Sequence, residues 1–270
     1  MYLRLNFLKR NHKIPRACDR IPQTSYTFEG YIADYLKAIT EQWLKPAPYA
    51  NPGMLEMFRD RDRSPLRCMK PWAGEFAGKY LTHAVQIYRL TRDFQLHQHL
   101  KRFVEELVSL QDDDGYLGPW PKEYRLANEA PNVNYPLDQP ERYTNLSFAK
   151  WGHYLTEPNK KSVSGTWDTW GHYHIMVGLL LWYEIANDRN ALKCVRNIAD
   201  LMCARFLSDG ETKRMVDTGS SEMNLAPVHS LAILYTILKD KRYLDLAVQI
   251  VGEFSATDVN GKPDNMAGGY

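Results

Sequence analysis

One short pattern recurs three times along the chain and constrains its fold more than any other feature. A tyrosine is followed five residues later by an aspartate, and a leucine comes three or four residues after that. The three copies are YRLTRDFQL from residue 88, YEIANDRNAL from residue 183 and YTILKDKRYL from residue 235. An aspartate in this place can accept hydrogen bonds from the free N–H groups of a helix start. The pattern therefore predicts three helical hairpins, each with a tight turn and an aspartate N-cap.

Apolar residues recur at intervals of three and four on both sides of these turns, which is typical of helices. The periodic stretches are 30–44, 75–90, 94–110, 172–185, 190–207, 224–238 and 242–254. No stretch shows sustained two-residue alternation with hairpin turn signals. In each pair the first helix is more apolar and the second is amphipathic, which indicates inner and outer rings of helices. We predict an all-α fold built from αα-hairpin repeats.

Two stretches, 46–72 and 112–167, lack this periodicity and are expected to be long loops. The second is rich in tyrosine and tryptophan, whereas disordered segments are poor in aromatic residues. We therefore expect 112–167 to form an ordered cover over one face of the helices. Residues 1–29 are expected to form a locally basic N-terminal arm, and 30–270 to form one helical domain.

Composition excludes several classes of function. The chain has 34 basic and 32 acidic residues and a net charge of +2, which argues against an electrostatic nucleic-acid binder. The longest apolar run, IMVGLLLWY, is far shorter than the roughly 20 residues that span a bilayer. No apolar signal-peptide core is visible near the N-terminus, so we expect a cytoplasmic protein without membrane contacts. The four cysteines are well separated and form no CxxC pair, which predicts reduced thiols: Cys18, Cys68, Cys194 and Cys203.

The candidate site lies at the starts of the inner helices. Thirteen residues before the three repeated tyrosines stand Glu75, Trp170 and Glu222, each among polar or aromatic neighbours. Hairpins packed side by side would bring these helix starts together at one end of the domain. The predicted catalytic residues are Glu75, Asp168 and Glu222. The predicted substrate-binding residues are Trp72, Tyr116, Trp170, His172, His174 and Asn224.

Capping and the helix dipole alone would explain any single acidic or amide residue at these positions. The case for a site rests on three equivalent helix starts, together with tryptophans and histidines that capping does not require. Neither 97/99 nor 172/174 is a zinc-binding histidine pair, because residues two apart do not share a helix face. His172 and His174 each remain open to two interpretations, a group facing a pocket or a hydrogen-bonded histidine in the core.

Paired carboxyl groups facing each other across a cleft are the usual equipment for breaking a glycosidic bond. Tryptophan and tyrosine rings would stack on the faces of sugars. Our first hypothesis is therefore a glycoside hydrolase-like protein that binds a carbohydrate. The rival hypothesis is a non-catalytic helical-repeat scaffold that binds carbohydrate or protein. Two carboxyl groups within about 5–10 Å of each other would favour hydrolysis.

Three blocks of this sequence resemble the β-L-arabinofuranosidase-like glycoside hydrolases of family 127. They are PWAGEFAGKY at 71–80, QDDDGYLG at 111–118 and WDTWGHYH at 167–174, within a resemblance that runs from about residue 51 to about 254. The resemblance implies an (α/α)6 barrel of six hairpins that acts on glycans, with the site at one end. It also implies that His174 is a barrel-facing histidine that contacts the sugar. Glu222 resembles an acidic residue at the start of a later inner helix.

The sequence departs from that family in one important respect. The resemblance implies a zinc-bound cysteine nucleophile from a later segment with adjacent cysteines, and this chain has no adjacent cysteines. We therefore expect no cofactor bound by this chain, and hydrolysis by the isolated chain stays an open question. About three and a half hairpins are present, which suggests the N-terminal part of a barrel, either a fragment, a truncated product or a chain completed by a partner. We predict an exposed apolar edge along 224–238 and its outer partner, and self-association through it.

Overall fold

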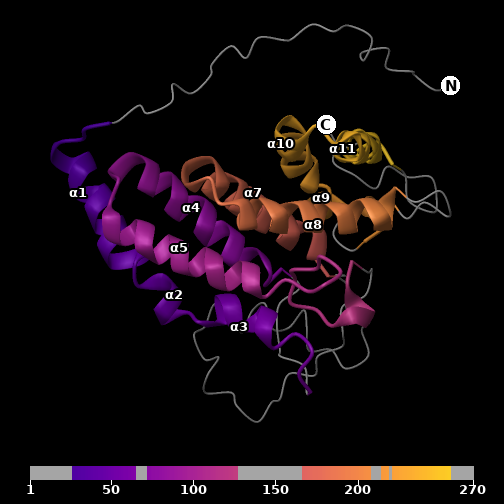
Figure 1. Cartoon of the computed structure of the whole chain (residues 1–270), viewed down its shortest axis with the longest axis horizontal. Helices are drawn as coiled ribbons and strands as arrows, with labels where there is room; N and C mark the ends of the chain where they lie inside the picture. Colours follow the sequence, from indigo (N-terminus) through magenta and orange to yellow (C-terminus); the bar gives the residue numbers. More distant parts are fainter. Residues whose placement is uncertain (1–25, 65–71, 127–165, 208–213, 219–220, 257–270) are drawn as a thin grey trace, which may run out of the picture.

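The computed structural model describes residues 26–64, 72–126, 166–207, 214–218 and 221–256, and within them all regular structure is helical (Figure 1). This confirms the predicted all-α fold. No helix in these ranges is both long and apolar enough to cross a membrane. The longer helices are α1 (Gly30–Ile39), α4 (Glu75–Thr91), α5 (Phe94–Ser109), α7 (Asp168–Ala186), α8 (Arg189–Phe206), α10 (Pro227–Leu238) and α11 (Lys241–Glu253). The short elements are η2 (Thr40–Leu44), α2 (Ala47–Ala50), α3 (Gly53–Arg59), η3 (Lys122–Tyr124), η5 (Met215–Asp217) and α9 (Ser221–Asn224).

The three repeated turns form as predicted. In each, the tyrosine carbonyl accepts a hydrogen bond of 2.8–2.9 Å from the residue just before the aspartate. That residue is left-handed in all three turns, with φ of 54° at Arg92, 52° at Asn187 and 59° at Lys239. The aspartate then accepts from backbone N–H groups at the start of the next helix. One left-handed residue reverses the chain and one side chain caps the new helix.

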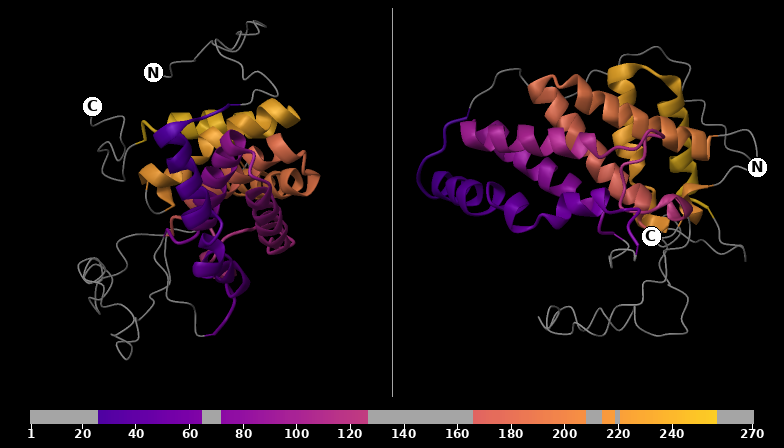
Figure 2. Two further views of the ribbon diagram at one scale, coloured as in Figure 1. Left: turned by 90° about the vertical axis from the view of Figure 1, so that its left-hand side faces the viewer. Right: turned by 60° about the horizontal axis from the view of Figure 1, so that its bottom comes forward.

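The hairpins are α4–α5, α7–α8 and α10–α11. Their first helices contact one another, α4 against α7 and α7 against α10, while α5, α8 and α11 lie outside them (Figures 1 and 2). The core lies between these two layers. Most positions of α7 are buried or half-buried, whereas α5, α8 and α11 each bury one face. The inner and outer helices predicted from the apolar pattern are therefore confirmed.

Helices α4 and α7 approach unusually closely because glycines line their contact. A Cβ atom added to Gly78 would lie 2.5 Å from the carbonyl oxygen of His174 and would overlap other backbone atoms of α7. Gly74 and Gly171 face each other one turn earlier, where the added Cβ of Gly171 would lie 3.3 Å from the Gly74 carbonyl carbon. Small residues let two helix backbones come together, so these glycines set the distance between the two inner helices that carry most of the site.

The structure differs from the predicted elements in three places. The stretch 30–44 begins as α1 and ends in the π-helix η2. The stretch 224–238 is divided, because Pro227 begins α10 and the chain turns between it and α9. The stretch 46–72, expected to be a loop, contains the short helices α2 and α3. The predictions for 1–25 and 127–165 lie outside the described residues.

The exposed apolar side chains include one set at the predicted edge and a larger set elsewhere. At the predicted edge, Leu231 and Leu234 of α10 are buried, but Ile237, Val248 and Val251 are 37%, 51% and 54% exposed. The larger set was not predicted and lies on α1 and η2, where Tyr31 is 81%, Tyr35 is 55% and Trp43 is 64% exposed.

Candidate functional site

The first two turns of α7 carry functional side chains on two different sides. Asp168 and His172 are four residues apart and contact the loop that follows α5. Trp170 and His174 are also four apart, and Trp170 contacts α4. Residues two apart on an α-helix point about 200° apart. The histidines at 172 and 174 therefore do not share a face, as the sequence predicted.

The group facing the loop is buried and fully hydrogen-bonded. Asp168 accepts from the Tyr116 hydroxyl at 3.0 Å and from the Leu126 N–H at 2.9 Å. The Nδ1 atom of His172 lies 2.8 Å from the Asp168 carbonyl oxygen, and its Nε2 accepts from the Leu117 N–H at 3.2 Å. A carbonyl only accepts and an amide only donates, so these contacts are those of neutral His172 with its proton on Nδ1. Both side chains hold the loop against α7.

Tyr116 connects this group to a charged cluster in the loop. The Arg125 guanidinium lies 4.2 Å from the centre of the Tyr116 ring and pairs with Asp112 at 2.5 Å and Asp114 at 3.1 Å. Burial, followed by the neighbouring Asp168 carboxylate, raises the pKa of the Tyr116 phenol well above its usual value. Tyr116 is therefore a protonated donor, and its ring is fully buried. A sugar would reach it only if the loop moved.

The group facing α4 consists of Glu75, Lys79, Trp170 and His174, which we call the α4–α7 cluster. One oxygen of Glu75 pairs with the Lys79 ammonium at 2.8 Å, and the other accepts from the indole N–H of Trp170. The Lys79 ammonium also lies 5.5 Å from the centre of the Trp170 ring. The rings of His174 and Trp170 pack edge to face, with their centres 4.4 Å apart. Both oxygens of Glu75 are thus occupied by groups of the cluster itself.

His174 is the member of the cluster with an unused polar atom. Its Nε2 is buried and has no hydrogen-bond partner among the residues that the structure describes. Burial first, and then the nearby Lys79 and His83, lower the pKa of His174 to about 4, so the ring is neutral at neutral pH. A buried polar atom without a partner costs about 1–3 kcal/mol. A ligand hydroxyl bound to it would offset this cost, once a neighbouring group had moved to let the hydroxyl in.

The remaining predicted residues surround these two groups. Trp72 packs against Trp167 with ring centres 5.1 Å apart. Asn224 is buried, and its side chain accepts from the Trp170 N–H at 3.2 Å and donates to the Thr166 carbonyl at 3.2 Å. It therefore joins α9 to the first turn of α7. Glu222 lies in α9, but its side chain is outside the described part of the chain, so its catalytic role stays a prediction.

Sequence reasoning missed two groups of residues. Lys79 and His83 stand four and eight residues after Glu75, and this spacing places them on the same face of α4. That signal was available in the sequence. The contact of Arg125 with the Tyr116 ring had no such signal, because it depends on how the loop folds back on itself.

Nowhere in the described ranges do three histidine, cysteine, aspartate or glutamate side chains come together as a metal site would require. Cys194 and Cys203 are free thiols on the outer helix α8, and burial raises the pKa of each to about 12.

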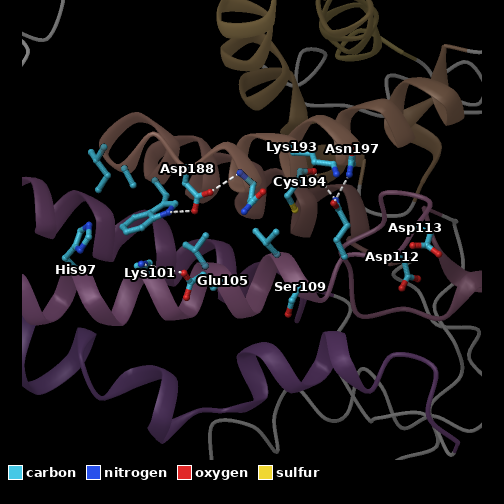
Figure 3. Close-up of a pocket in the computed structure, with 17 residues that line it drawn as sticks. His97, Lys101, Glu105, Ser109, Asp112, Asp113, Asp188, Lys193, Cys194 and Asn197 are labelled. Carbon is cyan, nitrogen blue, oxygen red and sulfur yellow. Dashed lines mark hydrogen bonds and ion pairs between the residues drawn. The ribbon is translucent and has the colours of Figure 1, made fainter.

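A groove of about 1100 Å³ lies between the outer helices α5 and α8 (Figure 3). Its lining includes Trp182, near the C-terminal end of α7, whose indole N–H already donates to Asp188 at 3.0 Å. Two lysines and four acidic residues also line it, and none of the predicted site residues does. Size alone therefore does not mark the functional site.

The fold is that of an (α/α)-barrel glycoside hydrolase domain, with inner and outer helical hairpins and a cluster of indole, imidazole and carboxylate groups at the starts of the inner helices. The chain belongs to the β-L-arabinofuranosidase family, GH127 catalytic domain, whose description matches residues 26–268.

Two solved structures share the fold. One is Ara127N-Se, a GH127 β-L-arabinofuranosidase from Geobacillus stearothermophilus T6, at 15% identity and a TM-score of 0.58, covering 87% of this chain and 33% of that one. The other is the GH127 β-arabinofuranosidase BT3674, at 18% identity and a TM-score of 0.59, covering 88% and 35%. The chain thus spans about one third of the length of each. A search of curated proteins found no match.

Proposed function

We propose that this chain binds an arabinofuranose-containing glycan at the α4–α7 cluster and forms the sugar-recognition part of a family 127 glycoside hydrolase. The observation that carries the proposal concerns His174, whose ring lies beside the Trp170 indole. Its buried Nε2 has no partner in the described part of the chain. Sugars present hydroxyl groups next to apolar C–H faces. An imidazole nitrogen can form a hydrogen bond with a sugar hydroxyl, and an aromatic ring beside it can pack against the C–H face.

The other members of the cluster position these two side chains. Glu75 anchors the Trp170 indole through its N–H and holds Lys79 in place. Because His174 is neutral, it can either donate to or accept from a hydroxyl, depending on its tautomer. Uncharged glycans are therefore the ligands that this cluster suits.

The positions of the carboxylates favour recognition over hydrolysis by Glu75 and Asp168. Asp168 lies on the side of α7 that faces the loop, whereas Glu75 of α4 contacts a different side of α7 at Trp170. The oxygens of both carboxylates are occupied by groups of the protein. In the proposed function both are positioning residues. The family supports a glycoside hydrolase role for the whole barrel rather than the rival scaffold role.

Calorimetric titration with arabinofuranosyl oligosaccharides tests the proposal. His174→Ala should weaken binding about tenfold or more, the effect of losing one hydrogen bond worth about 1.4 kcal/mol. His99→Gln is the control, because His99 is bonded to Tyr49 on the outer side of the domain. Absence of glycan binding by the unmodified chain, or equal losses in both variants, would contradict the proposal. Hydrolysis of a chromogenic arabinofuranoside, with and without zinc, is measured separately.

A further inference from the structure

Buried side-chain atoms without a hydrogen-bond partner concentrate near the starts of α4 and α7. The described part of the chain contains five such atoms, and three of them belong to Trp120, Trp167 and His174. His174 is already a member of the α4–α7 cluster. The other two atoms are indole nitrogens, and both tryptophans line one small space beside Asp168 and His172, which we call the indole pocket.

The indole pocket is closed in this structure. Besides the two tryptophans, its lining includes three glycines from α4, the loop after α5 and α7: Gly74, Gly118 and Gly171. As it stands, the pocket is too narrow to hold a water molecule. Trp120 is only 2% exposed, whereas Trp167 is half-buried and packs against the ring of Trp72. A ligand therefore enters only when a ring moves, and Trp167 is the ring nearer to solvent.

Trp167 connects the indole pocket to the α4–α7 cluster. Trp167, Trp170 and His174 follow one another at spacings of three and four residues, so they lie on one stripe of α7. At 1.5 Å per residue, the seven residues from Trp167 to His174 cover about 10 Å along the helix axis. One furanose ring is shorter than this. A glycan that reaches both ends of the stripe therefore contains at least two sugar residues.

The free groups of the indole pocket are donors only. Both oxygens of Asp168 already accept hydrogen bonds, from the Tyr116 hydroxyl and the Leu126 N–H. Both ring nitrogens of His172 are bonded as well. An indole nitrogen donates and does not accept, and the neighbouring Asp168 carboxylate repels an anion. The ligand atom that fits is therefore a neutral oxygen with free lone pairs, as in a sugar hydroxyl or ring oxygen.

We propose that the indole pocket binds an oxygen of a second sugar residue, next to the residue that His174 binds, and that Trp167 moves aside to admit it. The inference rests on the proposed function, because it extends the same glycan from the α4–α7 cluster. The hydrogen bonds to Trp120 and Trp167 replace no bond within the described residues. Binding therefore gains the new bonds without breaking old ones. The preferred ligand is a glycan of two or more residues rather than a single sugar.

Calorimetric titration of the whole chain compares methyl arabinofuranoside with a disaccharide of two arabinofuranose residues. The disaccharide should bind about tenfold more tightly, the effect of one added hydrogen bond. Trp167→Phe keeps an aromatic ring but removes the N–H, so it should abolish this difference. Binding of methyl arabinofuranoside by the same variant shows that it is folded. Trp43→Phe is the control and should keep the difference, because Trp43 is 64% exposed on η2.

Nuclear magnetic resonance of the indole N–H groups locates the second sugar residue among the seven tryptophans of the chain. The disaccharide should shift the resonances of Trp120 and Trp167, whereas methyl arabinofuranoside should shift mainly that of Trp170. Trp120→3-benzothienylalanine replaces the N–H by sulfur in a ring of nearly the same shape. It should therefore weaken binding of the disaccharide and leave the circular dichroism spectrum unchanged.

The possible failures of the two proposals are distinguishable. Equal affinities for the two ligands, or an unaltered difference in Trp167→Phe, would overturn the second subsite. Resonances of Trp120 and Trp167 that do not respond to the disaccharide would overturn it as well, with water as the only occupant of the pocket. In each of these cases binding of methyl arabinofuranoside would still support the proposed function. Absence of binding of either ligand would contradict both proposals.

Discussion

Replacing Gly78 by alanine tests the close contact on which the site depends. The added methyl group would enter the backbone of α7 at His174 and Ile175. Backbone atoms cannot rotate away as the end of a flexible side chain can. Helix α4 would therefore have to move away from α7, and the movement would displace His174 as well.

The expected loss of stability in Gly78→Ala follows from the geometry of this contact. Carbon and oxygen atoms normally pack at about 3.5 Å, so a contact of 2.5 Å requires a shift of about 1 Å. Overpacking of a core typically costs about 1–3 kcal/mol, and a clash with backbone belongs at the upper end of that range. This cost is partly offset, because alanine is about 1 kcal/mol more favourable than glycine in a helix interior. We expect a net loss of about 2 kcal/mol, which lowers Tm by about 4–8 °C for a chain of this size.

Gly252→Ala provides the matched control, because an added Cβ there meets nothing within 4 Å. It is the same substitution in a helix, and it should raise the free energy of unfolding by a few tenths of a kcal/mol up to about 1 kcal/mol. Thermal unfolding followed by circular dichroism measures both variants. A Gly78→Ala protein as stable as the unmodified chain would refute the close approach of α4 and α7.

Three further outcomes are expected. Asp168→Asn turns an amide donor toward the Leu126 N–H, so the variant should lose about 1–3 kcal/mol of the free energy of unfolding. Hydrogen exchange at the Leu126 amide should become faster. Unchanged exchange there would refute the role of Asp168 in holding the loop. Cys194 and Cys203 should resist alkylation at pH 8 until the chain unfolds, since burial raises their pKa to about 12; peptide mapping that finds them labelled in the folded protein would contradict this. The folded pKa of His174, about 4, lies below the usual 6.5, so its contribution to stability is complete above pH 6.5 and is lost as pH falls toward 4. This contribution amounts to about 1–2 kcal/mol after allowance for the partial exposure of His174. His174→Asn should therefore flatten the dependence of Tm on pH between pH 4 and 6.5.

The proposed glycan site was only partly predictable. The sequence indicated the helix starts that carry the α4–α7 cluster, and the helical repeat, about 200° between residues two apart, already separates His172 from His174. What lies opposite each histidine was not predictable. His172 meets the Leu117 N–H because the loop folds back, and His174 is left with an unused nitrogen because no described group reaches it.

Features decided within a few residues were thus readable from the sequence alone. The aspartate N-caps, the three turns and the alternation of inner and outer helices all depend on neighbours along the chain, through capping and the helical repeat. The tertiary structure alone decided the close fit of Gly78 against His174, the cation over the Tyr116 ring and the outward-facing aromatic stripe of α1. These depend on which faces meet across long stretches of sequence, and the pattern within one segment does not say what lies opposite it.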